Sequence, residues 1–377
     1  MLPRRPGIRL GFLPLILLGV LVIEELLYGQ IFIWHMNRYD KAVVLPITVV
    51  RNSANPSIAI VVILKDDTHR DEYDLAQQTL QCYAALQGYG IYIIDASAST
   101  SHNRSCPQKD FMFKRHCVLR RLMSTLREEW ILFLDADMGV INPNHLIEEY
   151  LPRKNSVHIV LYDRVMNHEV MAGSYLLRNS EISRRFLKNW ADAEFSLPES
   201  FHGTDNGALH MVLLETALPQ LRDERQKCRR EWEKSRNFDE LSRFEVCTRL
   251  VTAGRELEGI EIRNKTNRHR WSRDGWLTEN VWSPADFILH GWQKRRRDRL
   301  IFARWHSPLA ALPASLIPAD RGVPPRRIED YCKSAADAAK LWQYKDSFMD
   351  TDEKVQATIG QSTWRVDKEF REIANRL

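Results

Sequence analysis

The chain has 377 residues, with 54 lysine and arginine residues against 49 aspartate and glutamate residues, a formal net charge of +5. A hydrophobic fraction of 44% and a charged fraction of 27% allow a buried core and exclude wholesale disorder. The small basic excess argues against a dedicated nucleic-acid binder, and we find no internal period of a fibrous repeat. At roughly 150 residues per domain, the length predicts one large domain with additions, or two domains.

The N-terminus has the pattern of an export signal. Three arginines within the first nine residues precede an apolar run over 10–23, which resumes at 26–34 after two glutamates. At 1.5 Å per residue the first run gives about 21 Å, short of the ~30 Å hydrocarbon core, but no small-x-small cleavage site follows it. We therefore expect a cytosolic tail over 1–9, an uncleaved signal anchor over 10–34 and a lumenal remainder. Cleavage would give a secreted protein, and a core helix of a cytosolic protein is the alternative.

Two further features agree with a lumenal chain. N-glycosylation acceptor triplets begin at Asn103 and Asn264. Six cysteines, all beyond the apolar segment, allow disulfides, and the local pairings to test first are Cys106 with Cys117 and Cys228 with Cys247. Six buried thiols remain the alternative, and a structural zinc site is not expected because no Cys-x-x-Cys occurs.

From residue 56 onward strands and helices alternate. The run over 58–64 is continuously apolar and β-branched, as in a strand buried on both faces, and Lys65 and Asp66 follow it. Further strands are predicted at 91–95, 130–134, 157–163, 174–179 and 287–290. Helices are predicted at 73–86, 111–129, 183–194 and 207–218, with a charged surface helix within 222–243. This order predicts an open α/β sheet with its ligand at the carboxyl ends of the strands.

The segments outside this alternation divide the rest of the chain. Residues 35–55 show no clear periodicity and are expected to form a stem before the main domain, 56–305. Five prolines between 308 and 325 indicate a linker, and the last fifty residues read as helical. We therefore expect 306–377 to be a proline-rich linker with a helical C-terminal extension.

The strongest single motif is Asp135-Ala136-Asp137, which follows the third predicted strand. Two carboxylates one residue apart at a strand end can both turn towards a hard cation such as Mg²⁺ or Mn²⁺. One alternative is a pair of solvated loop acids, one of which caps a helix that begins near Asn144. Another is a haloacid-dehalogenase-type phosphatase, in which such acids act as nucleophile and general acid/base. That family carries its motif after the first strand, however, and usually has Thr or Val where Gly139 stands.

Two later motifs supply further polar groups. In His202-Gly203-Thr204-Asp205-Asn206, Thr204 or Asp205 would cap the following helix, so that Asp205 and Asn206 face the site; capping alone is the alternative. His290 ends the 287–289 strand and would complete a metal set with the two aspartates, unless it is a structural histidine. The basic run that begins at Lys294 could neutralise a diphosphate or form a solvated face.

Several segments occur in the order seen in a known family. They are 83–89, Lys114, 135–137, 172–180, 190–191 and 205–209. In this order they resemble glycosyltransferase family 34, the Golgi galactosyl-, xylosyl- and mannosyltransferases. The segments 106–117 and 202–206 look closer still to an uncharacterised domain family known mainly from nematodes, with a predicted transferase fold. The likeness covers about 56–300.

The resemblance implies a GT-A fold, a Rossmann-like open mixed sheet flanked by helices, in a single-pass type II protein of the Golgi or endoplasmic reticulum membrane. It also implies a nucleotide-diphosphate sugar donor, a glycan or glycoconjugate acceptor, Mn²⁺ or Mg²⁺, and retention of anomeric configuration. The alternative is an inactive sugar-nucleotide or glycan-binding protein on the same fold.

The resemblance also assigns roles to individual residues. The metal ligands would be Asp135, Asp137 and His290. Lys114 would approach the donor, and the expected donor-binding set is Lys65, Asp66, Lys114, Arg115, Asp135 and Lys294. Asp205 would hold the transferred sugar, with Asn206 where the family usually has Gln or Asp. Because His290-Gly291-Trp292 departs from the family's His-x-x-Gly, the resemblance does not fix the basic residue that binds the phosphate.

Overall fold

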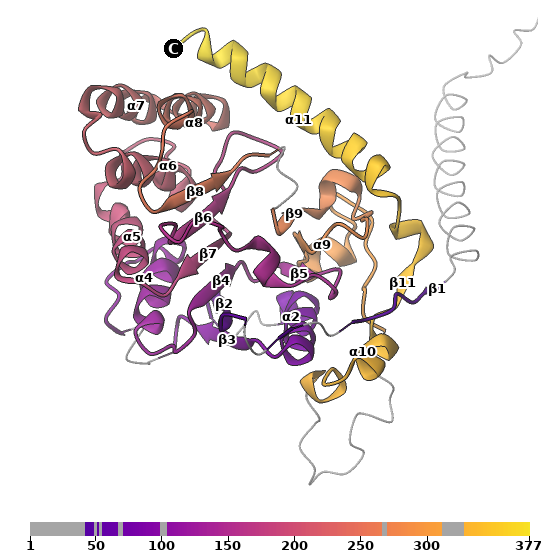
Figure 1. Ribbon diagram of the computed structural model, residues 1–377. Helices are drawn as coiled ribbons and strands as arrows, with labels where there is room; N and C mark the ends of the chain where they lie inside the picture. The colour runs from indigo at the N-terminus through magenta and orange to yellow at the C-terminus, as the bar shows by residue number, and fades with distance from the viewer. Residues whose placement is uncertain are drawn as a thin grey trace, which may run out of the picture.

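The computed structural model describes residues 42–48, 51–52, 55–66, 71–98, 104–265, 270–310 and 328–377. At its centre lies a six-stranded mixed sheet in the order β3-β2-β4-β7-β6-β8 (Figure 1). The strands are β2 (Ile58–Leu64), β3 (Gly90–Asp95), β4 (Trp130–Leu134), β6 (Ile159–Tyr162), β7 (Ser174–Arg178) and β8 (Ile260–Arg263). Only β7 in this sheet runs antiparallel to its neighbours, so the other five strands present their carboxyl ends at one edge.

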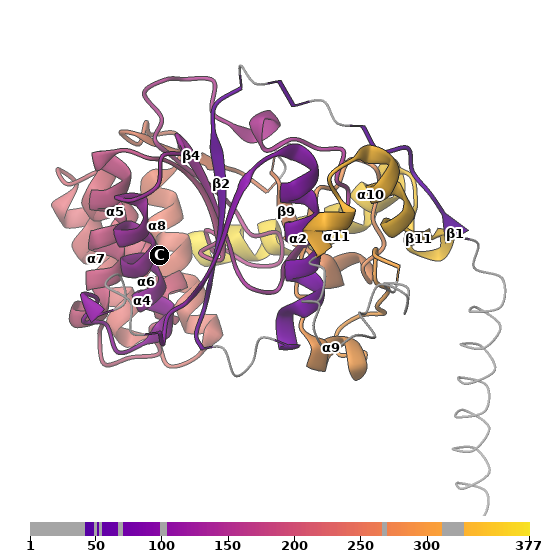
Figure 2. The same ribbon diagram turned by 90° about the horizontal axis from the view of Figure 1, so that it is seen from below.

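Helices cover both faces of this sheet. One face carries α4 (Phe111–Met123), α5 (Glu181–Asp192), α6 (Thr204–Ala217), α7 (Arg222–Lys234) and α8 (Phe238–Thr252). The other carries α2 (Asp74–Gln87) and a small second sheet, as Figure 2 shows. That sheet has the order β5 (Met138–Val140), β10 (Ile288–His290) and β9 (Ser272–Asp274). Alternate side chains of β2 enter two separate cores, which explains why the whole strand is apolar.

The last part of the chain packs against this domain. It contains α9 (Lys294–Asp298), α10 (Ala335–Leu341), β11 (Tyr344–Lys345) and the 23-residue α11 (Asp352–Ala374). The strand β11 pairs with β1 (Ala42–Val43), and α11 packs against α8 and the 3₁₀ turn Gly275–Thr278. Further 3₁₀ turns are Ile147–Tyr150, Ala193–Ser196, Ile328–Tyr331 and Asp346–Phe348. The described part of the expected stem is therefore attached to the domain.

All six cysteines form disulfides. Both local pairings proposed from the sequence, Cys106–Cys117 and Cys228–Cys247, are confirmed. The third bond, Cys82–Cys332, joins α2 to the C-terminal extension across a sequence separation of 250. The extension is thus tied covalently to the first helix of the domain.

Three predicted helices differ from the structure. The helix over 111–129 ends at Met123, where Ser124 and Thr125 donate backbone hydrogen bonds to the last free carbonyls. The charged region 222–243 is divided between two helices, because the side chain of Asn237 accepts from the backbone N–H of Glu240 and starts a new one. No α-helix begins near Asn144, because the element that follows it, Ile147–Tyr150, is a single 3₁₀ turn; the Asn144 side chain bonds Thr48 and Pro46.

Several predictions concern parts of the chain that the structure does not describe. The tail and signal anchor, 1–34, lie outside the described residues, as do Asn103, Thr266 of the second glycosylation triplet, and most of the proline-rich linker. Within the described residues, no helix combines the length and apolarity that crossing a membrane requires.

His210 on α6 is expected to make the stability of this domain sensitive to acid. Its Nε2 accepts from the backbone N–H of Val170 at 3.2 Å, and its Nδ1 lies 2.7 Å from the Thr248 hydroxyl. Burial, together with the charge of Arg249, lowers the pKa of His210 to about 3. The unfolded chain therefore binds a proton near pH 6.5 that the folded chain does not.

We expect this difference to lower the free energy of unfolding by about 2 kcal/mol between pH 6.5 and pH 5. Urea denaturation of wild type and His210→Gln at both values measures it. The variant should be less stable at pH 6.5 and lose less stability on acidification. Equal losses in the two proteins would contradict this account of His210.

Candidate metal and donor site

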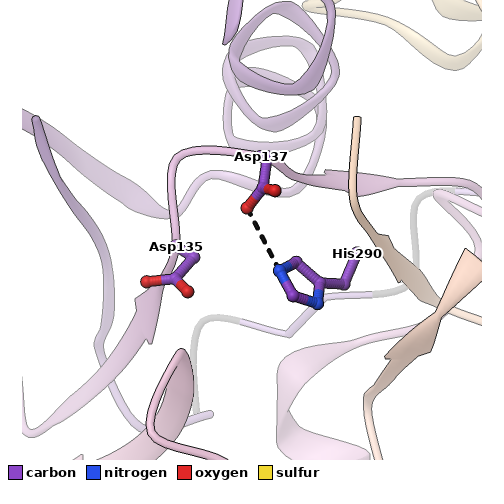
Figure 3. A group of neighbouring side chains, drawn as sticks. All are labelled: Asp135, Asp137 and His290. Atoms are coloured by element: carbon purple, nitrogen blue, oxygen red, sulfur yellow. Dashed lines mark ion pairs between the residues drawn. The ribbon is translucent and has the colours of Figure 1, made fainter. Parts of the chain in front are cut away.

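The two aspartates of the Asp-Ala-Asp motif and His290 come together at the carboxyl end of β4 (Figure 3). One ligand atom from each of the three residues lies within 4.8 Å of the others. Pairing of β5 with β10 places Met138 opposite His290, and the backbone carbonyl of Asp137 accepts from Gly291 and Trp292 at 3.0 and 2.8 Å. The predicted strand-end positions are thus brought together by the small second sheet.

Asp135 is held by its backbone and by a buried arginine. Its N–H donates to the carbonyl of Gly173 at 2.7 Å, and a Cβ on Gly173 would overlap the Asp135 carboxylate, so glycine leaves room for that side chain. One carboxylate oxygen accepts from Arg115. Burial raises the pKa of Asp135 although Arg115 acts in the opposite direction. A divalent cation would favour the ionised form of this carboxyl group.

Asp137 and His290 stabilise each other's charged forms. Burial opposes ionisation of Asp137, but His290, 3.2 Å away, and Gln293, 2.9 Å away, help to lower its pKa to about 2. Burial also opposes protonation of His290, yet Asp137 and Asp274 raise its pKa to about 10. The alternative of two solvated loop acids is wrong for Asp137, which is 6% exposed and bonded on both carboxylate oxygens.

The other ring nitrogen of His290 is fixed by Asp274, a residue that the sequence did not suggest. His290 Nδ1 lies 2.8 Å from Asp274 Oδ1, and Arg164 donates two hydrogen bonds of 3.0 Å to the same carboxylate. A carboxylate behind a histidine fixes the tautomer whose Nε2 is free to bind a metal. Two carboxylates and an imidazole so oriented fit Mn²⁺ or Mg²⁺, with the oxygen ligands suited to either.

Replacing Asp274 by asparagine tests this support. We expect Asp274→Asn to weaken Mn²⁺ binding about 10- to 100-fold, because the amide cannot hold the imidazole as the carboxylate does. Isothermal titration with Mn²⁺ measures the change. Asp286→Asn is the matched control, since Asp286 is also buried and paired with an arginine, Arg273, but contacts no residue of the cluster. Equal losses of affinity in both variants would show that Asp274 has no specific role.

Behind Asp135 lies a second buried ionic group. Arg115 Nη2 donates to Asp205 Oδ2 at 2.7 Å, and His116 Nε2 lies 3.0 Å from the same oxygen. The ring of His116 stacks on Trp190 at 3.7 Å, and Trp190 Nε1 donates to the Asp205 carbonyl at 2.9 Å. Burial opposes ionisation of Asp205, but Arg115 and His116 lower its pKa to about 2. Arg115 therefore bridges two carboxyl groups, Asp135 of the first group and Asp205 of the second.

Asp205 and its neighbours differ in part from the sequence prediction. Neither Thr204 nor Asp205 caps α6; Gly203 precedes the helix with a left-handed φ of 70°, and Asp205 turns inward. The Asp205 side chain is 0% exposed and makes its contacts inside the protein. Its contact with the transferred sugar stays a prediction. Asn206 Oδ1 accepts from the backbone N–H of Ala172 at 3.3 Å, which anchors the helix start to the segment that leads into β7.

Within the basic run 294–299, the residue nearest the cluster is Arg296 and not the expected Lys294. Lys294 is half exposed and pairs with Asp298 at 2.5 Å, whereas Arg296 Nη1 lies 3.9 Å from Asp137 Oδ2 and its guanidinium lies over Trp276. Lys65 follows β2 in an exposed position, with Asp66 beside it, and Lys114 lies half-buried on α4. The structure thus groups Asp135, Asp137, His290, Arg115 and Asp205, and it adds Asp274 and Arg296.

Comparison with solved structures gives distant likenesses. The glycosyltransferase involved in glycosylation of the major capsid of PBCV-1 is 12% identical, with 62% of this chain and 93% of that chain covered and a TM-score of 0.34. The glycosyltransferase GlyE of Streptococcus pneumoniae TIGR4 is 17% identical, with 42% of this chain and 43% of that chain covered and a TM-score of 0.30. The mannosyltransferase PcManGT of Pyrobaculum calidifontis, in complex with GDP-Man and Mn²⁺, is 10% identical, with 59% of this chain and 77% of that chain covered and a TM-score of 0.29. At these TM-scores the likenesses carry none of the argument below.

Sequence comparison identifies the family directly. No curated protein matches the chain. Residues 80–304 match a family described as "Protein of unknown function, DUF273", and this span includes every residue of the metal cluster and of the ionic group behind it. Since the match covers more than half of the chain, the protein belongs to the DUF273 family.

Proposed function

We propose that this protein is a metal-dependent glycosyltransferase of the secretory pathway. It would transfer a hexose or pentose from a nucleotide-diphosphate sugar to a hydroxyl of a glycan or glycoconjugate, with retention. The observation that carries the proposal is the Asp135, Asp137 and His290 cluster, supported by Asp274, at the carboxyl end of a strand in a largely parallel sheet. Ligands of open α/β sheets bind at that edge.

The residues around the cluster have roles that suit a diphosphate donor. Asp135, Asp137 and His290 would hold Mn²⁺ or Mg²⁺, which when bound neutralises negative charge on the departing diphosphate. Arg296, beside Asp137, adds positive charge on the same side. The nucleotide would lie over the carboxyl ends of β2 and β3, next to Lys65 and Asp66, with Lys114 approaching from α4.

The buried ionic group bears on how the sugar is transferred. Asp205 has no exposed surface and is paired with Arg115, which disfavours it as a covalent nucleophile. We therefore favour a front-face displacement. The bond from the anomeric carbon to the phosphate oxygen breaks, a bond to the acceptor oxygen forms on the same face, and the leaving phosphate accepts the acceptor's proton. Asp205 would then act by holding Arg115 against Asp135.

The phosphatase alternative gains no support from the geometry. Its general acid/base would have to be Asp137, whose two oxygens are occupied by His290 and Gln293. The motif also follows β4, which lies inside the sheet and comes after two earlier strand-helix units.

Thermal denaturation of the full chain with a panel of nucleotide-diphosphate sugars tests the proposal. We expect one nucleotide class to stabilise the protein in Mn²⁺ but not in EDTA, by about 3 kcal/mol at a ligand concentration a hundredfold above Kd. The same donor should then yield a glycosylated product with a glycan acceptor. Failure of every nucleotide to stabilise a folded protein would overturn the proposal. Metal-dependent donor binding without transfer to any acceptor would favour the inactive binding protein.

A further inference from the structure

A polar hollow lies at the same edge of the sheet as the metal cluster, two strands further along. It has a volume of about 290 Å³ and is lined at the strand ends by Asp163, which follows β6, and Lys265, which follows β8. His168 comes from the β6–β7 loop, Arg249 from α8 and Phe370 from α11. Because β4, β6 and β8 are parallel, their carboxyl ends put this hollow and the cluster on one side.

The hollow contains buried polar atoms that lack hydrogen-bond partners. Neither ring nitrogen of His168, which is 4% exposed, makes a hydrogen bond, although Nε2 lies 3.7 Å from Glu369 Oε1, and Oδ1 of Asp163 has no partner. The other Asp163 oxygen accepts from Arg249 at 2.6 Å, and Lys265 Nζ donates to the Asn167 carbonyl at 3.0 Å. Buried polar groups in native proteins are nearly always paired, with protein atoms or with ordered water, so these atoms are available to bond whatever enters the hollow.

The chemistry of these atoms selects the occupant. Burial, together with Lys265 and Arg249, lowers the pKa of His168 to about 4, so the ring is neutral, with one N–H donor and one acceptor nitrogen. Asp163 needs a donor, whereas Lys265 has N–H groups to give. The negative charge of a phosphate or carboxylate would be repelled by Asp163, and the positive charge of an ammonium group would be repelled by Lys265. Neutral hydroxyl groups satisfy all three residues, and Phe370 adds an apolar wall.

The hollow is close to the metal cluster but separate from it. Glu169 lines the hollow and pairs with Arg164 at 3.0 Å, and Arg164 in turn holds Asp274 behind His290. This layer of ion pairs keeps the occupant of the hollow away from the reacting atoms. In the strand order β3-β2-β4-β7-β6-β8, the hollow also lies beyond β4 from the β3 and β2 strand ends, where we place the nucleotide.

We propose that this hollow is a saccharide subsite that holds a neutral sugar residue of the acceptor, remote from the hydroxyl that is glycosylated. The proposal rests on the function proposed above for the identity of the acceptor, but the hollow's own residues predict sugar binding by themselves. A second hollow of about 580 Å³ along β8 shares Arg249 and Phe370 with the first. An acceptor longer than one residue would extend into it, beneath the end of α11.

Binding of the full chain to a printed array of neutral glycans tests the subsite. We expect wild type to bind a defined group of glycans equally well in Mn²⁺ and in EDTA, because the hollow contains no residue of the metal cluster. The best glycan, titrated in solution, should bind about 10-fold more weakly to Lys265→Met and to His168→Leu, since each variant removes hydrogen-bonding groups. Lys354→Met is the matched control, because Lys354 lies on α11, is largely exposed and pairs with Asp350.

Each outcome decides between the two proposals. Absence of any glycan signal from a chain that binds nucleotide in Mn²⁺ would overturn the subsite and leave the function standing. Glycan binding by a chain that binds no nucleotide would overturn the proposed function and leave the subsite standing. Unchanged affinity in folded Lys265→Met would also overturn the subsite, and this variant carries the test if His168→Leu does not fold.

Discussion

Replacing Asp137 by alanine is expected to weaken Mn²⁺ binding more than 100-fold and to remove Mn²⁺-dependent binding of the donor nucleotide. Loss of a residue that only supports a metal ligand costs about 10- to 100-fold in affinity, so loss of the ligand itself should cost more. Of the two motif aspartates, Asp137 is the one whose carboxylate contacts His290, so its loss also removes a partner of the third proposed ligand. Titration calorimetry with Mn²⁺, followed by thermal denaturation with the nucleotide, measures the two effects.

The matched control for this variant is Asp350→Ala. The side chain of Asp350 is more exposed than that of Asp137 and lies outside the cluster, and among the ion pairs of the described residues it pairs only with Lys354. It should bind metal and nucleotide as wild type does. Retention of Mn²⁺ binding by Asp137→Ala would show that the cluster is not the metal site. The proposed glycosyltransferase would then lose its main support.

Replacing Arg115 by methionine is expected to destabilise the folded chain by about 3–5 kcal/mol, because it leaves a buried charge without its partner. Asp205 is 0% exposed, and the Thr204 hydroxyl and His116 that remain beside it bring no charge, because burial lowers the pKa of His116 to about 4. Urea denaturation at pH 7 measures the loss. Arg184→Met is the matched control, since Arg184 pairs with the exposed Glu181 on α5 and its loss should cost well under 1 kcal/mol.

The double variant Arg115→Met/Asp205→Asn separates charge from packing. It removes both members of the buried pair and should recover much of the stability that Arg115→Met loses. If the double variant is as unstable as the single one, the effect comes from lost packing of the long arginine side chain and not from the unpaired Asp205.

The sequence allowed the central sheet and the two aspartates at its edge to be predicted because both depend on local pattern. The strand β2 is apolar at all seven positions, and only a strand buried on both faces needs that. The acids directly after β4 could be placed at the edge of the central sheet by strand direction. The predicted strand that ends at His290 belongs instead to the small second sheet, whose pairing with β5 brings His290 to the aspartates.

The residues that were missed depend on contacts between distant segments. Asp274 lies on β9, whose three residues Ser-Arg-Asp show no apolar alternation and read as a loop. Arg296 and Lys294 belong to the same basic run, and only the turn of α9 directs Arg296 towards Asp137. Asp205 looks like a helix cap until the left-handed Gly203 is seen to turn it towards Arg115.

The bond between Cys82 and Cys332 has a consequence for the order in which the chain matures. The other two disulfides join cysteines 11 and 19 positions apart, so each pair can close soon after it is synthesised. Cys82 must wait for a partner that lies 250 residues later, about 10–50 s at ordinary rates of translation. During that interval its thiol has to remain unpaired while Cys106 and Cys117, the next cysteines in the sequence, are also present. Correct maturation therefore depends on the local pairs closing first, and the finished loop holds α2 and the C-terminal extension together even if the chain is later cut between them.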